Sequence, residues 1–130
     1  MITGRRQPSS AARERFAADT ELAGRFEDLL AMAREADDAL RQAQALNAPL
    51  SELRRLALAL DAALTAVTRA AYAAQRVQIG PRGYDDWIYR RKANAKPEVR
   101  IWTAEAERLL TLRERHRLAG IPDLPPGQAA

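Results

Sequence analysis

The sequence predicts an all-α protein: an antiparallel helical bundle of three long helices plus one or two short helices. Alanine, the residue with the highest helix propensity, is abundant, and aromatic residues make up only 5% of the 130 residues. Apolar residues recur at spacings of three and four over long segments, and no segment alternates with the period of two typical of a strand. Every strong helix stop lies between these segments.

The longest pattern runs from Ser51 to Ile79 and ends at Gly80-Pro81. Its apolar positions form a stripe about 100° wide, as expected of a helix that faces a core. The stripe consists of Leu53, Leu56, Ala57, Leu60, Ala63, Leu64, Val67, Ala71 and Ala74. The opposite face is mostly polar. A single helix cannot bury such a stripe, so the other helices must cover it.

Residues 1–9 are predicted to form a flexible basic arm, and residues 10–120 the helical bundle domain. Ser10 is predicted to cap a short helix that breaks or bends at Asp19-Thr20. A long helix near residues 20–46 follows. Its inward positions are Phe26, Leu29, Leu30, Ala33, Ala36, Leu40 and Ala43. The short connection that begins at Asn47 predicts an antiparallel hairpin with the next helix.

After Gly80-Pro81, either Asp85 or Asp86 is predicted to cap a short helix from Trp87 to about Ala93. Lys96-Pro97 then precedes a third long helix over residues 97–119. Its inward positions are Val99, Trp102, Ala106, Leu109, Leu110 and Leu112.

Arg113 and His116 continue this stripe with polar side chains. We therefore expect the shared core to end near Leu112, and the final turns to project beyond the bundle or to meet another chain. Residues 121–130 are predicted to be an extended or disordered, proline-rich tail.

Cysteine is absent, which excludes disulfides and thiolate metal sites and fits a reducing compartment. The first residues lack the apolar run of a signal peptide. The longest uncharged run, Gln42 to Ser51, is far shorter than the roughly 20 residues of a membrane span. We expect a soluble, cytoplasmic protein with no membrane partner.

The residues available for catalysis are few: one histidine and three serines, of which Ser10 and Ser51 lie where helix caps are expected. The sequence contains no HExxH, P-loop, GxGxxG or EF-hand pattern. Glu114-Arg-His116 does not have the Glu-x-x-His spacing of a di-iron bundle. We therefore expect no enzymatic activity, no catalytic residue, no metal, no cofactor and no small-molecule substrate.

Positive charge is concentrated in two parts of this moderately basic chain, whose net charge is +4. Residues 1–15 carry four arginines against one acid, and residues 76–117 carry eleven Lys and Arg against six acids. Four of the seven aromatic residues lie between positions 84 and 102, among these basic residues. Nucleic-acid binding uses this mixture, because cations neutralise phosphates and aromatic rings stack on bases. The predicted nucleic-acid-binding residues are Arg82, Tyr84, Trp87, Arg90, Arg91, Lys92, Lys96 and Arg100.

A structural interpretation of the same cluster stays open. Tyr84, Trp87 and Trp102 could be core anchors that dock the short helix, with the arginines keeping the surface soluble. The basic arm at the N-terminus could likewise be a solvated terminus.

In size, basic charge and helix content the chain resembles the small subunits of CRISPR effector complexes, and equally helical phage packaging proteins. No motif or residue carries this resemblance. It and the basic cluster favour a non-catalytic helical subunit that contacts an RNA or single-stranded DNA backbone without sequence readout, inside a larger nucleoprotein assembly with other protein subunits. The rival is an adaptor that binds proteins through exposed helix faces, at residues 69–76 or 112–118. A helix-turn-helix reader of DNA fits less well, because the predicted helices are long.

Overall fold

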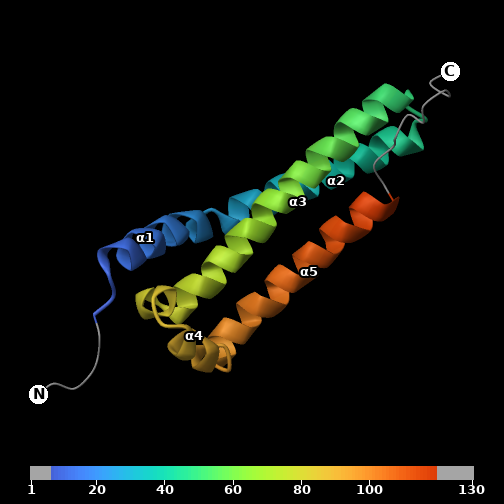
Figure 1. The fold of residues 1–130 in the computed structure, drawn as a ribbon. Helices are drawn as coiled ribbons and strands as arrows, with labels where there is room; N and C mark the ends of the chain where they lie inside the picture. Colours follow the sequence, from blue (N-terminus) through green and yellow to red (C-terminus); the bar gives the residue numbers. More distant parts are fainter. Residues whose placement is uncertain (1–6, 120–130) are drawn as a thin grey trace, which may run out of the picture. The chain divides into compact units, whose positions relative to one another are not determined.

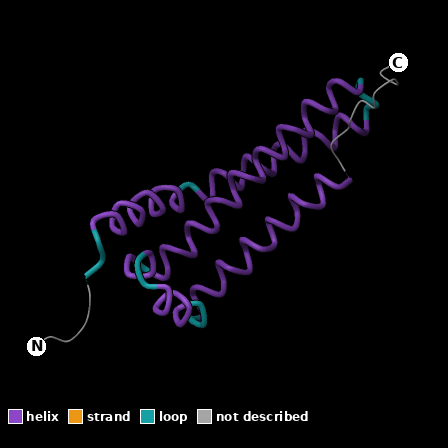
Figure 2. The backbone as a smooth tube through the Cα atoms, in the orientation of Figure 1, coloured by secondary structure: helices purple, strands orange, loops and turns teal. Residues whose placement is uncertain are grey.

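The structure, a computed structural model, describes residues 7–119, and 88% of these residues are helical. No strand occurs among them, and the prediction of an all-α fold is confirmed. In chain order the helices are α1 (Ser10–Gly24), α2 (Phe26–Ala45), α3 (Leu50–Ile79), the 3-10 helix η1 (Pro81–Tyr84), α4 (Trp87–Ala93) and α5 (Pro97–Ala119) (Figures 1 and 2). Most of the predicted arm and the whole predicted tail lie outside the described residues.

The first helices differ from the prediction in where they begin and break. Ser9, not Ser10, is the N-cap of α1: its side chain accepts a hydrogen bond from the Ala12 amide. The predicted break at Asp19-Thr20 is wrong, because α1 continues to Gly24. Thr20 donates its hydroxyl to the Phe16 carbonyl inside the helix, and the Asp19 side chain bonds to distant residues instead of capping. The break falls at Arg25, one residue before α2 begins.

The hairpin between α2 and α3 forms as predicted (Figure 1). α2 ends in a Schellman motif, in which the Ala48 amide bonds to the Ala43 carbonyl and the Asn47 amide to the Gln44 carbonyl. Asn47 has a φ of 54°, the left-handed conformation that this motif requires and that asparagine tolerates better than most residues. The turn chemistry of Asn47 therefore ends α2, and α3 begins three residues later at Leu50.

The chain folds as two compact units, which are described separately. Among the described residues, unit 1 contains residues 7–26 together with Arg69–Glu107, and unit 2 contains Glu27–Thr68 together with residues 108–119. α3 and α5 each contribute one segment to each unit.

The core of unit 1 is built largely from alanines, which let helices approach closely. Its buried apolar residues are Ala12, Phe26, Ala70, Ala71, Ala73, Ala74, Ile79, Ala93, Val99 and Ala106. Phe26 and Trp102 meet edge to face with ring centroids 5.0 Å apart, so Trp102 is an anchor of this core. Gln75 donates to the hydroxyl of Thr103 at 2.6 Å, which links α3 to α5.

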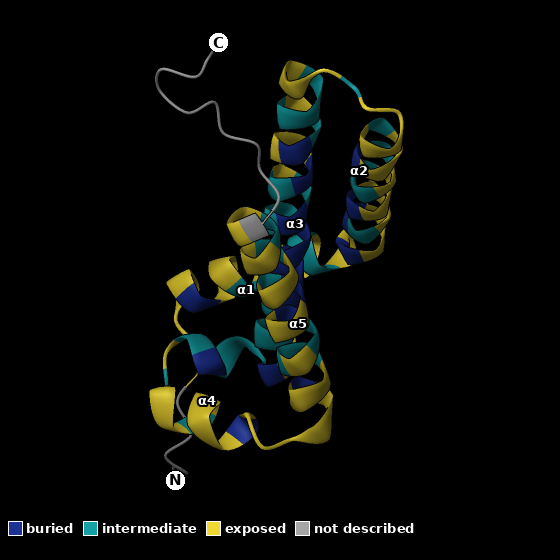
Figure 3. Ribbon diagram, turned by 90° about the vertical axis from the view of Figure 1, so that its right-hand side faces the viewer, coloured by how far each residue is buried: buried dark blue, intermediate teal, exposed yellow. Residues whose placement is uncertain are grey.

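The core of unit 2 is richer in leucine and follows the predicted stripes. Its buried apolar residues are Leu29, Ala33, Leu40, Ala57, Leu60, Leu64, Val67 and Leu109. Figure 3 shows the buried positions on α2 and α3 as one-sided bands. Leu58, on the opposite face of α3, is 45% exposed, as that face of the pattern predicts.

α3 is the one helix among the described residues that is long and apolar enough to cross a membrane, with a mean hydropathy of 1.3 in its most apolar window. Its central residues Asp61 and Arg69 would be costly in a bilayer. Asp61 is ion-paired with Arg117 of α5, and 44% of the apolar window is buried inside the protein. The apolar character of α3 is thus explained by its burial in the core of the protein.

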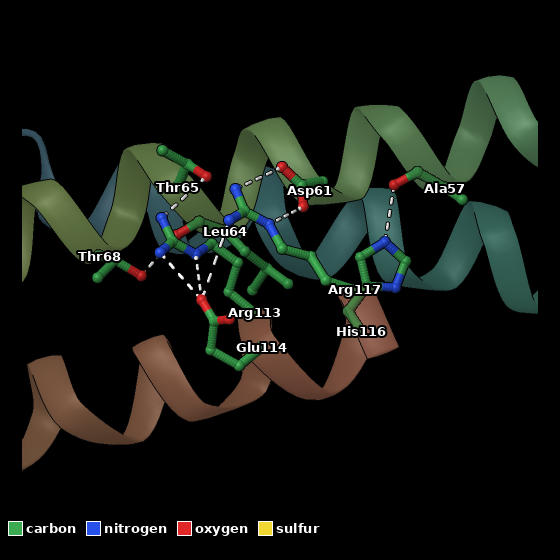
Figure 4. Close-up of polar contacts among 9 residues, drawn as sticks. All are labelled: Ala57, Asp61, Leu64, Thr65, Thr68, Arg113, Glu114, His116 and Arg117. Atoms are coloured by element: carbon green, nitrogen blue, oxygen red, sulfur yellow. Dashed lines mark hydrogen bonds and ion pairs between the residues drawn. The ribbon is translucent and has the colours of Figure 1, made fainter. Parts of the chain in front are cut away.

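The end of α5 corrects a second expectation, because its polar residues do not project away from their unit. Arg117 makes two hydrogen bonds to the Asp61 carboxylate, of 2.6 and 3.2 Å. Arg113 donates to the hydroxyl of Thr65, and the Nε2 of His116 lies 2.7 Å from the Ala57 carbonyl oxygen, to which it must donate (Figure 4). Polar contacts therefore continue the α3–α5 interface beyond Leu112, which is itself 39% exposed.

We predict that Leu60→Ala lowers the free energy of unfolding by about 2–5 kcal/mol, because the side chain is only 5% exposed and its loss leaves a cavity. Leu58→Ala, on the exposed face of the same helix, should cost less than about 1 kcal/mol. Urea denaturation of the two variants measures both values. Equal losses at the two positions would contradict the assignment of the buried face.

Candidate nucleic-acid interface

A polar network in unit 1 fixes the position of η1 and of Tyr84. Asp19 of α1 accepts hydrogen bonds from the Arg76 Nε at 2.7 Å and from the Tyr84 hydroxyl. The Tyr84 ring packs edge to face against Phe16 with centroids 6.3 Å apart, and the Arg15 guanidinium lies over it at 5.4 Å. One carboxylate thus joins α1, α3 and η1.

The electrostatics of this network favour a charged Asp19 and a neutral Tyr84. Burial alone raises the pKa of Asp19, but the hydrogen bonds from Arg76 and Tyr84 outweigh it, and the pKa lies below its usual value. Burial and the hydrogen bond to Asp19 raise the pKa of Tyr84. Asp19 accordingly stays an acceptor and Tyr84 a donor, so the network holds across neutral pH.

Two glycines shape the turn that follows α3. Gly80 has a φ of 99°, a conformation that disfavours other residues, and it ends α3 as predicted. Gly83 is buried, and a Cβ there would collide with the side chain of Ile79. Its carbonyl accepts a hydrogen bond from Arg90 Nη1 at 2.9 Å. The turn therefore holds α4 close to η1.

The N-terminus of α4 is held by the two aspartates that precede it. Asp86 is the N-cap and accepts from the Tyr89 amide at 3.0 Å, and this hydrogen bond lowers the pKa of the Asp86 carboxyl. Asp85 has a different function: it accepts from the backbone amide and the hydroxyl of Ser9, at 2.7 and 3.0 Å. Both acids in front of the basic cluster are thus used by the fold.

α4 is amphipathic in an unusual sense, because its outward face combines apolar and basic side chains. Its inward face is Tyr89 and Ala93, which pack against Ile79 and Val99. The outward positions are Trp87, Ile88, Arg91 and Lys92, all of them exposed. Figure 3 shows α4 as mostly exposed, with the buried position near its C-terminal end.

Trp87 is 60% exposed and lies one helical turn before Arg91, on the same side of α4. Exposure of a tryptophan to this extent leaves its ring face available to a ligand. Arg91 and Lys92 have no ion-pair or hydrogen-bond partner for their side chains among residues 7–119. The exposed indole ring and the Arg91 cation therefore share one face of α4, and Lys92 flanks it.

The remaining basic residues lie next to α4 in the chain. Lys96, in the turn before α5, is exposed and holds its Nζ 5.9 Å from the centre of the Tyr89 ring. Arg100 is exposed in the first turns of α5 and lines a polar hollow of about 420 Å³ with Gln75, Asn94 and Glu107, among others.

The structure divides the eight predicted residues into two groups. Arg82, Tyr84 and Arg90 hold the fold: Arg82 lies over the Tyr89 ring at 4.7 Å and pairs with Asp86 at 3.4 Å, while Tyr84 and Arg90 make the contacts given above. The other five are exposed and lie between positions 87 and 100 of the chain. We call them the basic surface: Trp87, Arg91, Lys92, Lys96 and Arg100.

Sequence analysis did not single out three arginines of unit 2, Arg34, Arg41 and Arg108, which line one groove together with leucines. They lie on two helices far apart in the sequence, so no linear pattern brings them together. Within residues 7–119, no three His, Cys, Asp or Glu side chains are placed to hold a metal ion.

Comparison with protein-family models, with curated proteins and with solved structures finds no match for this chain.

We predict that Asp19 makes stability depend on acid. Its folded pKa lies below the value of 3.8 in the unfolded chain, so its contribution is fully present above that pH and is lost as the pH falls through the folded pKa. The free energy of unfolding should therefore fall between about pH 5 and pH 2, and fall less in Asp19→Asn. Tyr84→Phe, which removes one donor, should show an intermediate fall. Urea titrations across this range measure all three, and the same fall in Asp19→Asn as in the wild type would rule this contribution out.

Proposed function

We propose that this protein is a non-catalytic helical subunit that binds the backbone of a single-stranded nucleic acid through the basic surface. The observation that carries the proposal is the exposed Trp87 ring one helical turn from the exposed Arg91, on the same side of α4, with the exposed Lys92 next to Arg91 in the chain. Base stacking on an aromatic ring contributes about 1–3 kcal/mol per base, and unpaired cations supply the electrostatic part of the affinity.

The positions of the acidic residues support this proposal. Asp85 and Asp86 are the acids closest to the basic residues of α4 in the chain, and each is already bonded to groups of the fold. Arg82 offsets the charge of Asp86 through an ion pair, and Ser9 holds Asp85 in place. Residues 82–100 carry six Lys and Arg against three acids, so the segment keeps a net positive charge. Such a surface attracts phosphates without regard to base sequence.

The rigidity of the platform also supports it. Tyr89 and Ala93 fix α4 on the core, Arg90 holds the preceding turn, and Asp19 holds η1 through Tyr84. A base that stacks on Trp87 would meet a surface already in place, which reduces the entropy lost on binding. Single-stranded ligands are favoured over duplexes, because only unstacked bases can reach the indole ring.

Exposed helix faces in unit 1 are a weaker basis for the rival function of protein adaptor. In the stretch from Arg69 to Arg76, Arg76 is taken up by Asp19 and Tyr72 is half-buried. Within the basic surface, Arg91 and Lys92 have no such contacts among residues 7–119, so we place nucleic-acid binding first.

The proposal predicts that replacing Arg91, Lys92 and Lys96 with alanine weakens binding to unrelated single-stranded sequences alike. It should also reduce the slope of log K against log salt by about two, since each phosphate contact with a single strand contributes roughly 0.7. Stability should stay within about 0.5 kcal/mol, because the three side chains are exposed. Fluorescence polarisation with labelled oligonucleotides at several salt concentrations measures the slope.

The matched control removes the same charge elsewhere, by replacing the exposed Arg25, Arg69 and Arg115 with alanine. It should leave the slope nearly unchanged. Trp87→Ala should weaken binding to single strands by about fivefold or more, without a shift in melting temperature. Identical salt slopes in the two triple variants would refute the proposal, as would a loss of stability in Trp87→Ala with unchanged affinity.

A further inference from the structure

Three arginines from three helices of unit 1 line one small hollow beside η1. They are Arg15 of α1, Arg76 of α3 and Arg90 of α4, and Gly83 and Tyr84 lie among them. Arg15, Arg76 and Tyr84 also line an adjoining hollow of about 200 Å³. Since a water molecule takes up about 30 Å³, this volume has room for a phosphate group, which contains five heavy atoms.

Only one of these three positive charges is balanced by a carboxylate. Asp19 is the one acid of the described chain that lines these hollows, and it pairs with Arg76 through hydrogen bonds of 2.7 and 3.1 Å. Arg90 donates to the Gly83 carbonyl, which is neutral. Arg15 has no hydrogen-bond or ion-pair partner among residues 7–119 and lies over the Tyr84 ring. Two positive charges therefore remain, on Arg15 and Arg90.

The two aspartates that follow Tyr84 in the chain do not line either hollow. Asp86 pairs with Arg82, and Asp85 accepts hydrogen bonds from Ser9 at the start of α1. Neither carboxylate is bonded to Arg15 or Arg90. An anion from outside the chain would therefore find these two guanidinium groups without a carboxylate partner.

The fold also holds these arginines in place before any ligand arrives. A guanidinium has five N–H donors, and hydrogen bonds within the chain use two of them on Arg76 and one on Arg90. The remaining donors are available to an anion. Because Asp19 fixes Arg76 and the turn at Gly83 fixes Arg90, binding would order few further side chains, which favours affinity.

We propose that this cluster of Arg15, Arg76 and Arg90, the arginine site, binds the phosphate group of a phosphomonoester. Such a group carries a charge of about −1.5 to −2 at pH 7, which matches the two arginines that lack a carboxylate. A backbone phosphodiester carries only about −1. Planar guanidinium groups suit phosphate oxygens, because they donate two parallel hydrogen bonds. The site is separate from the basic surface and does not depend on the proposed function.

The test compares methyl phosphate, a monoester, with dimethyl phosphate, a diester. Isothermal titration calorimetry of the full chain, in a buffer without phosphate and at constant ionic strength, measures both affinities. Methyl phosphate should bind saturably with a Kd of about 5 mM or lower. It should bind at least about fivefold more tightly than dimethyl phosphate, because it carries nearly twice the charge.

Variants of α1 separate the arginine site from general surface charge. Arg15→Gln should weaken methyl phosphate at least about tenfold. Arg15→Lys keeps the charge but loses the planar group, and should give an intermediate affinity. Arg13→Gln removes the same charge from the same helix, at an exposed position outside both hollows, and should bind like the wild type.

Thermal melts provide a readout that a purely structural role of Arg15 would not change. Methyl phosphate should raise the melting temperature of the wild type and of Arg13→Gln, because a ligand of the folded state stabilises it. It should not raise the melting temperature of Arg15→Gln. Circular dichroism spectra verify that all variants are folded.

A phosphomonoester group occurs on small molecules and at the end of a nucleic-acid strand, and a labelled oligonucleotide with and without a 5′-phosphate distinguishes these sources. If the 5′-phosphate tightens binding to the wild type but not to Arg15→Gln, the strand end occupies the site. If it has no effect while methyl phosphate binds, the ligand is a small phosphate ester. Both results support the site. The methyl phosphate titration contains no nucleic acid, so a failure of binding at the basic surface would not affect it.

The proposal is overturned by any of three results. These are no saturable binding of methyl phosphate up to about 50 mM, equal affinity for dimethyl phosphate, and an affinity for methyl phosphate in Arg15→Gln equal to that in Arg13→Gln.

Discussion

The fold depends on the need to bury one side of α3. This helix has 30 residues, and its apolar stripe is covered by α2 and α5 in unit 2 and by α1, η1, α4 and α5 in unit 1. The residues of the stripe change along the helix, from leucines in the first half to alanines in the second. Because alanine fills little volume, the core of unit 1 contains few large apolar side chains. The packing of its helices is therefore also fixed by polar contacts and by edge-to-face contacts between aromatic rings.

The Asp19 network illustrates this. The Asp19 side chain is only 15% exposed. A carboxylate buried to this extent would destabilise the fold without hydrogen-bond partners, and Arg76 and Tyr84 supply them. It joins three elements that the alanine core holds only weakly. The same arrangement withdraws Tyr84 from the surface, so the candidate interface and the anchor that supports it share the segment after α3 but use different residues. The position of α4, which carries most of the basic surface, is thus tied to the core of unit 1 through the turn at Gly83.

Comparable polar contacts close the other end of α5. Three side chains of α5 bond to α3 there. Arg113 bonds to Thr65, His116 to the Ala57 carbonyl and Arg117 to Asp61. These contacts hold α5 beside α3 and leave the groove between α2 and α5 open. This groove has buried leucines at its base and is also lined by arginines, so its chemistry differs from that of the basic surface in unit 1.

The sequence by itself determined the helices, their buried faces and most of their ends. Period and caps are local properties, so Leu60 could be placed inside and Leu58 outside, Gly80 could be given its role, and the cap of α4 could be narrowed to Asp85 or Asp86. Tertiary structure decided how polar side chains are used. The sequence predicted Asp19 as a cap, but in the structure it bonds to Arg76 and Tyr84. The sequence likewise predicted that the core ends before Arg113 and His116, but these side chains bond to Thr65 and to the Ala57 carbonyl. The partners of these side chains lie about 50 to 65 residues away along the chain, and a pattern read over a few helical turns contains no information at that range.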